Sequence, residues 1–203
     1  MRYVTFAAIL SFVFSSLLAN AALAQEQTRA LVEIGLTVDV RYDYYAVEGT
    51  AAREILNSMQ RNGPSDGDES FFAITSAQSG FRYLPVETPQ GCTLDEIGVQ
   101  TEITVTLPKW VDVKSATPAL QETWEHFMSR LLQHERWHID ASKTAAEEFY
   151  AVLFDLQQPT CAQLDSHAKR MIQNISDRSA RQNVEYDRDT DHGRLEGVVW
   201  PVM

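Results

Sequence analysis

The chain has 203 residues, of which 44% are hydrophobic, 22% charged and 10% aromatic, a composition that suits one globular domain with a substantial core. Disordered, collagen-like and repeat architectures are therefore excluded. The chain carries 17 Lys and Arg against 28 Asp and Glu, a formal net charge of −11, so binding to nucleic acid or to an anionic lipid surface would oppose the field of the protein itself.

The first 24 residues have the features of a secretory signal peptide. Met1-Arg2 forms a short basic start, an apolar run extends from Phe6 to Leu18, and Ala22-Leu23-Ala24 places small residues where signal peptidase reads them. We expect cleavage before Gln25 and a periplasmic or secreted mature protein. The apolar run is too short to span a bilayer, and no other stretch reaches the roughly 20 apolar residues of a membrane helix. We therefore expect no membrane insertion after cleavage.

The mature chain is expected to begin with a strand and a helix. Apolar and polar residues alternate over 34–44, which predicts a strand, and the 3.6-residue period over 50–61 predicts a helix. Asn62-Gly63-Pro64 ends this helix, and 65–70 is typical of a polar loop.

Strands are expected to continue up to residue 107. Residues 71–83 favour a hairpin or two short strands, and 85–91 favours a loop that leads to Cys92. The clearest strand is 97–107, in which every second residue from Ile97 to Leu107 is apolar or threonine. Such alternation predicts one buried and one solvated face.

Two long helices are predicted after residue 117. Thr117 is expected to cap the first helix, whose apolar residues recur every three or four positions as far as Leu156, and Pro159 ends it. Thr160 with Gln163 offers a capping box for the second helix. Because the connection is so short, the two helices are expected to run antiparallel. The inner face of the second helix is predicted to comprise Leu164, Ala168, Met171, Ile175 and Ser179.

Cys92 and Cys161 are the only two cysteines. An exported chain folds where thiols are usually oxidised, so a disulfide between them is the default interpretation. The alternative is a pair of metal ligands or a reactive thiol, which the absence of a CxxC pair disfavours.

An HExxH motif, His134-Glu135-Arg136-Trp137-His138, lies in the middle of the first long helix. Residues four apart share one helix face, so both imidazoles can bind one ion while Glu135 deprotonates a bound water. Both histidines also fall on the apolar face, where buried imidazole nitrogens would be unsatisfied unless something binds them. The motif predicts a Zn²⁺ site, and the alternative is that these are ordinary core or surface histidines.

The third protein ligand is expected near the C-terminus. Ala141 and Thr144 occupy the places where a single-segment site would have glycine and a third histidine. Counting about 30 Å from His138 to the turn and back along the second helix reaches residues 180–185, just before a very polar segment, 186–193. We predict His192 as the third ligand. Asp187 is the alternative ligand, or a carboxylate that orients an imidazole.

Other polar residues near this segment have two interpretations. Tyr186 either donates its hydroxyl to a developing oxyanion or packs as an ordinary aromatic. Asp140 either orients a neighbouring group or is solvated. The remaining histidines and carboxylates are predicted to be surface residues, namely His126, His167, Asp189 and Asp191.

The chain resembles a family of bacterial proteins catalogued as a domain of unknown function and predicted to be secreted zinc-dependent proteases. The resemblance covers nearly the whole mature chain and is most specific at the HExxH motif and at His192-Gly193. It implies zinc and proteolysis without a defined substrate. Its further marks are Tyr42 to Gly49, Asn62-Gly63-Pro64, Gly91-Cys92, Thr106 to Trp110, Cys161, Tyr186-Asp187 and Thr190.

We therefore expect an α+β fold in which a small, mostly antiparallel sheet packs against a long antiparallel helical hairpin that carries HExxH, as in zincins. Residues 25–203 are expected to form a single metallohydrolase domain. The strand over 97–107 is either an edge along which an extended substrate pairs or an ordinary central strand.

The predicted activity is hydrolysis of peptide bonds in a peptide or protein substrate. Zn²⁺ held by His134, His138 and His192 would activate a water, with Glu135 as general base and Tyr186 stabilising charge. The alternatives are a zinc amidase that acts on cell-wall peptides and a non-enzymatic envelope protein with a structural metal.

Overall fold

The computed structural model describes residues 33–66 and 69–201. The expected signal peptide, Met1–Ala24, and its cleavage site before Gln25 lie outside the described residues. Within the described part of the chain, no helix combines the length and the apolar character that crossing a membrane requires.

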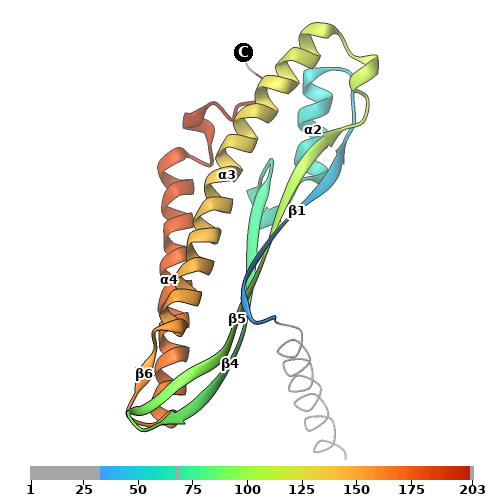
Figure 1. The fold of residues 1–203 in the computed structure, drawn as a ribbon. Coiled ribbons are helices and arrows are strands. Elements are labelled where there is room, and N and C mark those ends of the chain that lie inside the picture. The colour runs from blue at the N-terminus through green and yellow to red at the C-terminus, as the bar shows by residue number, and fades with distance from the viewer. Residues whose placement is uncertain (1–32, 67–68, 202–203) are drawn as a thin grey trace, which may run out of the picture.

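Over these residues the fold is α+β, with a mixed sheet, three α-helices and two short 3-10 helices (Figure 1). Helices α3 and α4 lie side by side, and α3 runs along the sheet (Figure 1). In chain order the elements are β1 (Gly35–Val47), α2 (Ala52–Asn62), β2 (Ser65–Asp66), β3 (Glu69–Ser70), β4 (Ile74–Thr88), β5 (Gly91–Trp110), the 3-10 helix η1 (Val113–Ser115), α3 (Pro118–Phe154), β6 (Gln157–Gln158), α4 (Cys161–Thr190) and the 3-10 helix η2 (Arg194–Glu196).

Strand β5 lies in the centre of the main sheet. It pairs in parallel with β1 on one side, from Gly35 opposite Gly98 to Val47 opposite Trp110. It pairs antiparallel with β4 on the other side, and with the short β6 at its start. The sheet is therefore mixed: two of its three pairings are antiparallel, as expected, and the β1–β5 pairing is parallel. The parallel pair arises because α2 and β4 carry the chain back before β5 and bring it in beside β1 in the same direction.

The prediction of a hairpin or two short strands over 71–83, followed by a loop over 85–91, is wrong. Residues 74–88 form one long strand, β4, and the expected loop over 85–91 belongs to a hairpin in which Thr88 lies opposite Gly91. Pro85 was expected to begin the loop, but in the structure it lies opposite Leu94 within β4. An edge strand tolerates proline because only one of its sides must donate hydrogen bonds.

The strand predicted over 97–107 is the middle of β5 and has neighbours on both sides. It is the central strand, so the idea that an extended substrate pairs along it is wrong.

Two apolar cores follow α3 along the sheet. The first contains Trp110, Trp124 and Phe127 together with Trp200 near the C-terminus. The second contains Phe149 and Leu153 and includes Cys92. Between these parts of α3 lie its buried polar residues, His134, Glu135, His138 and Ser142.

Local signals explain where the long helices begin. The hydroxyl of Thr117 accepts a hydrogen bond from the backbone amide of Leu120, and that of Thr160 accepts one from Gln163. Helix α4 continues through most of the very polar segment 186–193, as far as Thr190, and therefore carries both Tyr186 and Asp187.

Contacts between α3 and α4 pair Glu148 with Arg178, His138 with Asn183 and His134 with Asp187. Residues later in α4 therefore contact residues earlier in α3. This pairing brings the end of α4 to the HExxH motif.

The disulfide between Cys92 and Cys161 is present and joins the start of β5 to the start of α4 across 69 residues of sequence. It confirms the pairing expected from the sequence.

Replacement of both cysteines by serine should lower the free energy of unfolding by about 4 kcal/mol, because the unfolded chain regains the entropy of an open loop. Urea unfolding of the mature chain and of the double variant measures this difference. Equal unfolding midpoints would contradict it.

Candidate metal centre

Three acceptor atoms converge where α4 crosses the HExxH motif. The Nε2 atoms of His134 and His138 lie 3.2 Å and 2.9 Å from the same oxygen, Oδ1 of Asp187, and 3.4 Å from each other. Both histidines are buried, with 4% and 7% exposure. His134, His138 and Asp187 form a group of described residues whose ligand atoms lie close enough to hold one metal ion.

The other nitrogen of each imidazole is already engaged. Nδ1 of His138 lies 2.6 Å from Oδ1 of Asn183, whose amide nitrogen donates to the carbonyl of Ser179. The Asn183 oxygen therefore accepts, and the His138 Nδ1 carries the proton. Nδ1 of His134 lies 2.9 Å from the carboxylate of Glu196, which can only accept when ionised. Both rings thus turn the lone pair of Nε2 toward Asp187.

Three lone pairs facing one another require a positive charge between them. Burial lowers the pKa of each imidazole, but the hydrogen bonds to Asp187 and to Glu196 or Asn183 outweigh it, so both pKa values are raised. Burial raises the pKa of Asp187, yet its bonds to the two histidines lower it overall. A proton fills this need, and so does a divalent cation.

The chemistry of the donor set fits Zn²⁺. Two imidazoles and one carboxylate are a ligand set of catalytic zinc sites, which keep a fourth position for water. The backing of each Nδ1 by an acceptor is the usual arrangement around metal-binding histidines.

Glu135 is almost fully buried, with 4% exposure, and stands beside the ligands without belonging to their group. Its carboxylate accepts a 2.7 Å hydrogen bond from the hydroxyl of Thr75 on β4. Burial raises its pKa, against the opposing effect of the Thr75 bond and of both histidines. A carboxyl with a raised pKa next to a metal-bound water is suited to accept a proton.

The centre opens into a cleft of about 1050 Å³. The start of β4 and the residues before it form one wall, and α3, α4 and the C-terminal segment form the others. The side chains that line it include Phe71, Ile74, Thr75, His134, Glu135, His138, Val184, Asp187, His192 and Val198.

His192 lines this cleft but is not one of the three residues that converge. It follows α4 with a left-handed backbone, φ +50°, and its ring lies 5.2 Å from that of Phe71. The convergent group contains Asp187, the alternative ligand, and does not contain His192.

Tyr186 does not line the cleft. Its hydroxyl donates to both oxygens of Glu196, at 2.9 Å and 3.0 Å, and its ring stacks on Trp137 with 3.9 Å between centroids. Burial and the neighbouring Glu196 raise the pKa of this hydroxyl. In this arrangement the hydroxyl of Tyr186 is directed at the Glu196 carboxylate and not into the cleft.

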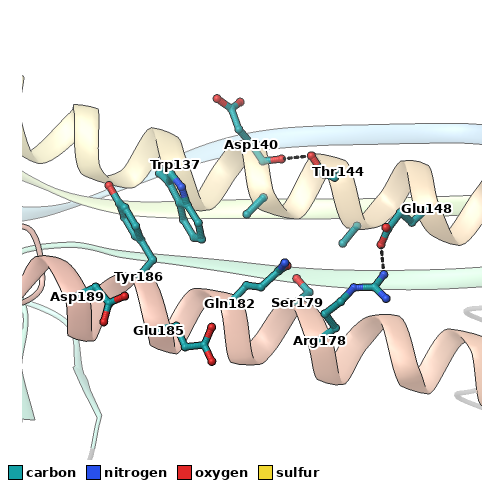
Figure 2. Close-up of a pocket in the computed structure, with 12 residues that line it drawn as sticks. Trp137, Asp140, Thr144, Glu148, Arg178, Ser179, Gln182, Glu185, Tyr186 and Asp189 are labelled. Carbon is teal, nitrogen blue, oxygen red and sulfur yellow. Dashed lines mark hydrogen bonds and ion pairs between the residues drawn. The ribbon is translucent and has the colours of Figure 1, made fainter.

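Tyr186 and Trp137 instead lie at one end of a second groove, of about 600 Å³, between α3 and α4 (Figure 2). Asp140 and Asp189 line this groove and are exposed, with ion pairs to Lys143 and Arg188. They do not reach the metal ligands, in agreement with the solvated interpretation of both.

The remaining residues predicted at the surface are not members of the convergent group, although Asp191 lines the same cleft. His126 is exposed and His167 is half-buried. Asp191 forms an ion pair with Arg194.

A glycine allows the chain to pass directly over the His134 ring after α4. Gly193 has φ +80°, and a Cβ at this position would lie 3.0 Å from Cγ of His134 and 2.7 Å from Cγ2 of Val198. Only glycine fits both the backbone and the space.

Sequence reasoning missed Asn183, Glu196 and Thr75. Asn183 had a usable signal, because it precedes Asp187 by four residues and shares its helix face. Thr75 and Glu196 carried no local signal, since their roles arise only from tertiary contacts.

A family model described as a bacterial protein of unknown function (DUF922) matches residues 42–193. The match covers more than half of the chain, so the chain belongs to this family. It includes the HExxH motif, Asp187 and both cysteines, and it ends before Glu196. Comparison with curated proteins found no match, and comparison with solved structures found none either.

The ligand set can be tested by comparing two substitutions. Asp187→Asn should weaken Zn²⁺ binding by more than about 100-fold, beyond the loss typical of a residue that only supports a ligand. His192→Asn should keep one metal ion per chain, because its ring is not part of the convergent group. Elemental analysis and equilibrium dialysis of the mature protein measure both. The reverse pattern would make His192 the ligand.

Gly193→Ala should weaken metal binding because its Cβ displaces the His134 ring, in addition to a backbone cost of about 1–2 kcal/mol. Gly35→Ala is the matched control, since Gly35 also has a positive φ, +106°, but a Cβ there meets nothing within 4 Å. The control should keep its metal affinity. Equal affinities of the two variants would show that the close approach at Gly193 does not matter.

Proposed function

We propose that this member of the DUF922 family is an exported zinc-dependent peptidase that hydrolyses peptide bonds with Glu135 as general base. One observation carries the proposal: a buried carboxylate that is not a ligand lies beside two imidazoles and an aspartate that converge in an open cleft. The zincin-like arrangement, in which an antiparallel helical pair carries HExxH against a sheet, belongs to the same proposal.

Zn²⁺, when bound by His134, His138 and Asp187, would lower the pKa of a water molecule and polarise the scissile carbonyl. Glu135 would accept a proton from the water as its oxygen adds to the carbonyl carbon, and would return this proton to the amine nitrogen as the C–N bond breaks. The Thr75 hydroxyl holds one oxygen of Glu135, which fixes the carboxylate and leaves its second oxygen for the water. Asn183 and Glu196 keep the imidazoles in the tautomer that presents Nε2.

The substrate class follows from the wall of the cleft. Residues 70–75 line it, and within the described sheet β4 pairs only with β5. The other edge of β4 is therefore suited to pair with the backbone of an extended peptide, which gives affinity without strict sequence demands. A structural metal would need neither such an edge nor a buried Glu135.

Glu135→Gln keeps the size of the side chain and its hydrogen-bond acceptor for Thr75 but removes the base. Hydrolysis of unfolded casein should fall by about 100-fold or more, the scale of general base catalysis, while the zinc content stays at one per chain. Glu185→Gln is the matched control, because Glu185 is an exposed carboxylate of α4 outside the cleft.

Treatment with a chelator should abolish the activity, and added Zn²⁺ should restore it. Equal turnover by Glu135→Gln and the parent would overturn the mechanism. Cleavage of cell-wall peptides by the parent, with no cleavage of casein, would identify the zinc amidase instead. Zinc binding with hydrolysis of neither would identify a structural metal site.

A further inference from the structure

We propose that the C-terminal segment 193–200 is part of the metal centre, in which Glu196 positions the His134 imidazole for metal binding and Tyr186 positions Glu196. Glu196 and Tyr186 are positioning residues that act through His134. The inference rests on the metal site of the proposed function, but it does not depend on which bond is cut.

The contacts form a continuous chain from the ligand outward. The carboxylate of Glu196 accepts from Nδ1 of His134 at 2.9 Å and from the hydroxyl of Tyr186 at 2.9 Å and 3.0 Å. A carboxylate on Nδ1 fixes the tautomer and the ring plane, and it makes Nε2 a stronger donor to a metal. The hydroxyl of Tyr186 restrains the carboxylate that does this.

The two imidazoles differ in this respect. His138 is backed by the neutral amide of Asn183, whereas His134 is backed by an ionisable carboxylate. The stronger support therefore falls on His134, whose partner comes from outside the two long helices.

Stacked rings hold Tyr186 in place. Its ring lies 5.0 Å from that of His134 at an interplanar angle of 17°, and 3.9 Å from that of Trp137 at 9°. Figure 2 shows Trp137 of the HExxH motif and Tyr186 of α4 side by side. Trp137 is one of the two variable positions of the motif, and here it sets the place of the hydroxyl that reaches Glu196.

Two anchors hold the segment that carries Glu196. At its start, Gly193 passes over the His134 ring, and the carbonyl of Gly193 accepts from the amide of Val198 at 3.0 Å. At its end, Trp200 is buried against Trp124 and Phe127, and its indole nitrogen donates to the carbonyl of Ala52 at 3.0 Å. Glu196 lies between these two anchors. Because the chain is fixed before and after it, its carboxylate is held against His134.

Metal affinity tests this arrangement directly. Dissociation constants for Zn²⁺ alone are measured by competition with a chelating dye for the mature parent and for Glu196→Ala, Glu196→Gln and Tyr186→Phe. Glu196→Ala should weaken binding by about 10- to 100-fold. Glu196→Gln should lose less, because it keeps an acceptor but not the charge. Glu185→Gln, which removes an exposed carboxylate of α4, should bind as the parent does.

A double variant separates a relay from two independent effects. Tyr186→Phe should weaken binding in the parent but not in the Glu196→Ala background, because the hydroxyl acts through the carboxylate. Equal losses in both backgrounds would overturn the relay. The visible absorption of the Co²⁺-loaded protein should also differ between the parent and Glu196→Gln, which a purely structural role of Glu196 would not produce.

The outcomes keep this inference separate from the proposed function. Parent-like Zn²⁺ affinity in both Glu196 variants would overturn the inference and leave the peptidase proposal intact. If Glu196→Ala does not fold, the near-isosteric Glu196→Gln decides the question by its affinity and Co²⁺ spectrum. A parent protein that binds no Zn²⁺ would overturn the proposed function together with the inference.

Discussion

The structure around the HExxH motif depends on one electrostatic requirement: three acceptor atoms from α3 and α4 meet at distances of 2.9–3.4 Å and need positive charge between them. Unpaired polar groups at such burial would cost several kcal/mol. Other features serve this meeting point. Thr117 caps the start of α3, and the contacts between α3 and α4 bring Asp187 to the two histidines. Gly193 lets the chain pass directly over the His134 ring.

Local patterns in the sequence were sufficient where the interaction itself is local or is strongly favoured by chemistry. The caps at Thr117 and Thr160, the HExxH spacing and the Cys92–Cys161 disulfide are of this kind. The pairing of β1 with β5 is not, because alternation tells which face a strand buries but not which strand lies beside it. The position of Pro85 was likewise not predictable from local pattern, because proline interrupts a central strand but is tolerated in an edge strand such as β4.

The count along the two helices predicted which part of α4 meets the HExxH motif but left His192 and Asp187 as alternatives, and the convergent group contains Asp187. Counting from His138 to the turn and back reached residues 180–185, within about one helical turn of Asn183 and Asp187. The choice of His192 rested on the very polar segment 186–193 that follows this count. Helix α4 continues through this segment to Thr190, because its polar residues are compatible with an exposed helix face, and it presents Asp187 on its inner side. Glu196 could not be predicted from the sequence, because it meets His134 only through the tertiary contacts of the C-terminal segment.

The separation of the ligands along the chain has a thermodynamic consequence. His134 and His138 are neighbours on one helix, but Asp187 lies 53 residues beyond His134. Of the three proposed ligands, an unfolded chain therefore keeps only His134 and His138 close together, and the complete set is assembled only in the native state. Occupancy and folding are then linked, so the native state gains stability as the free metal concentration rises above the dissociation constant. The availability of metal where the chain folds would then influence the stability of the native state.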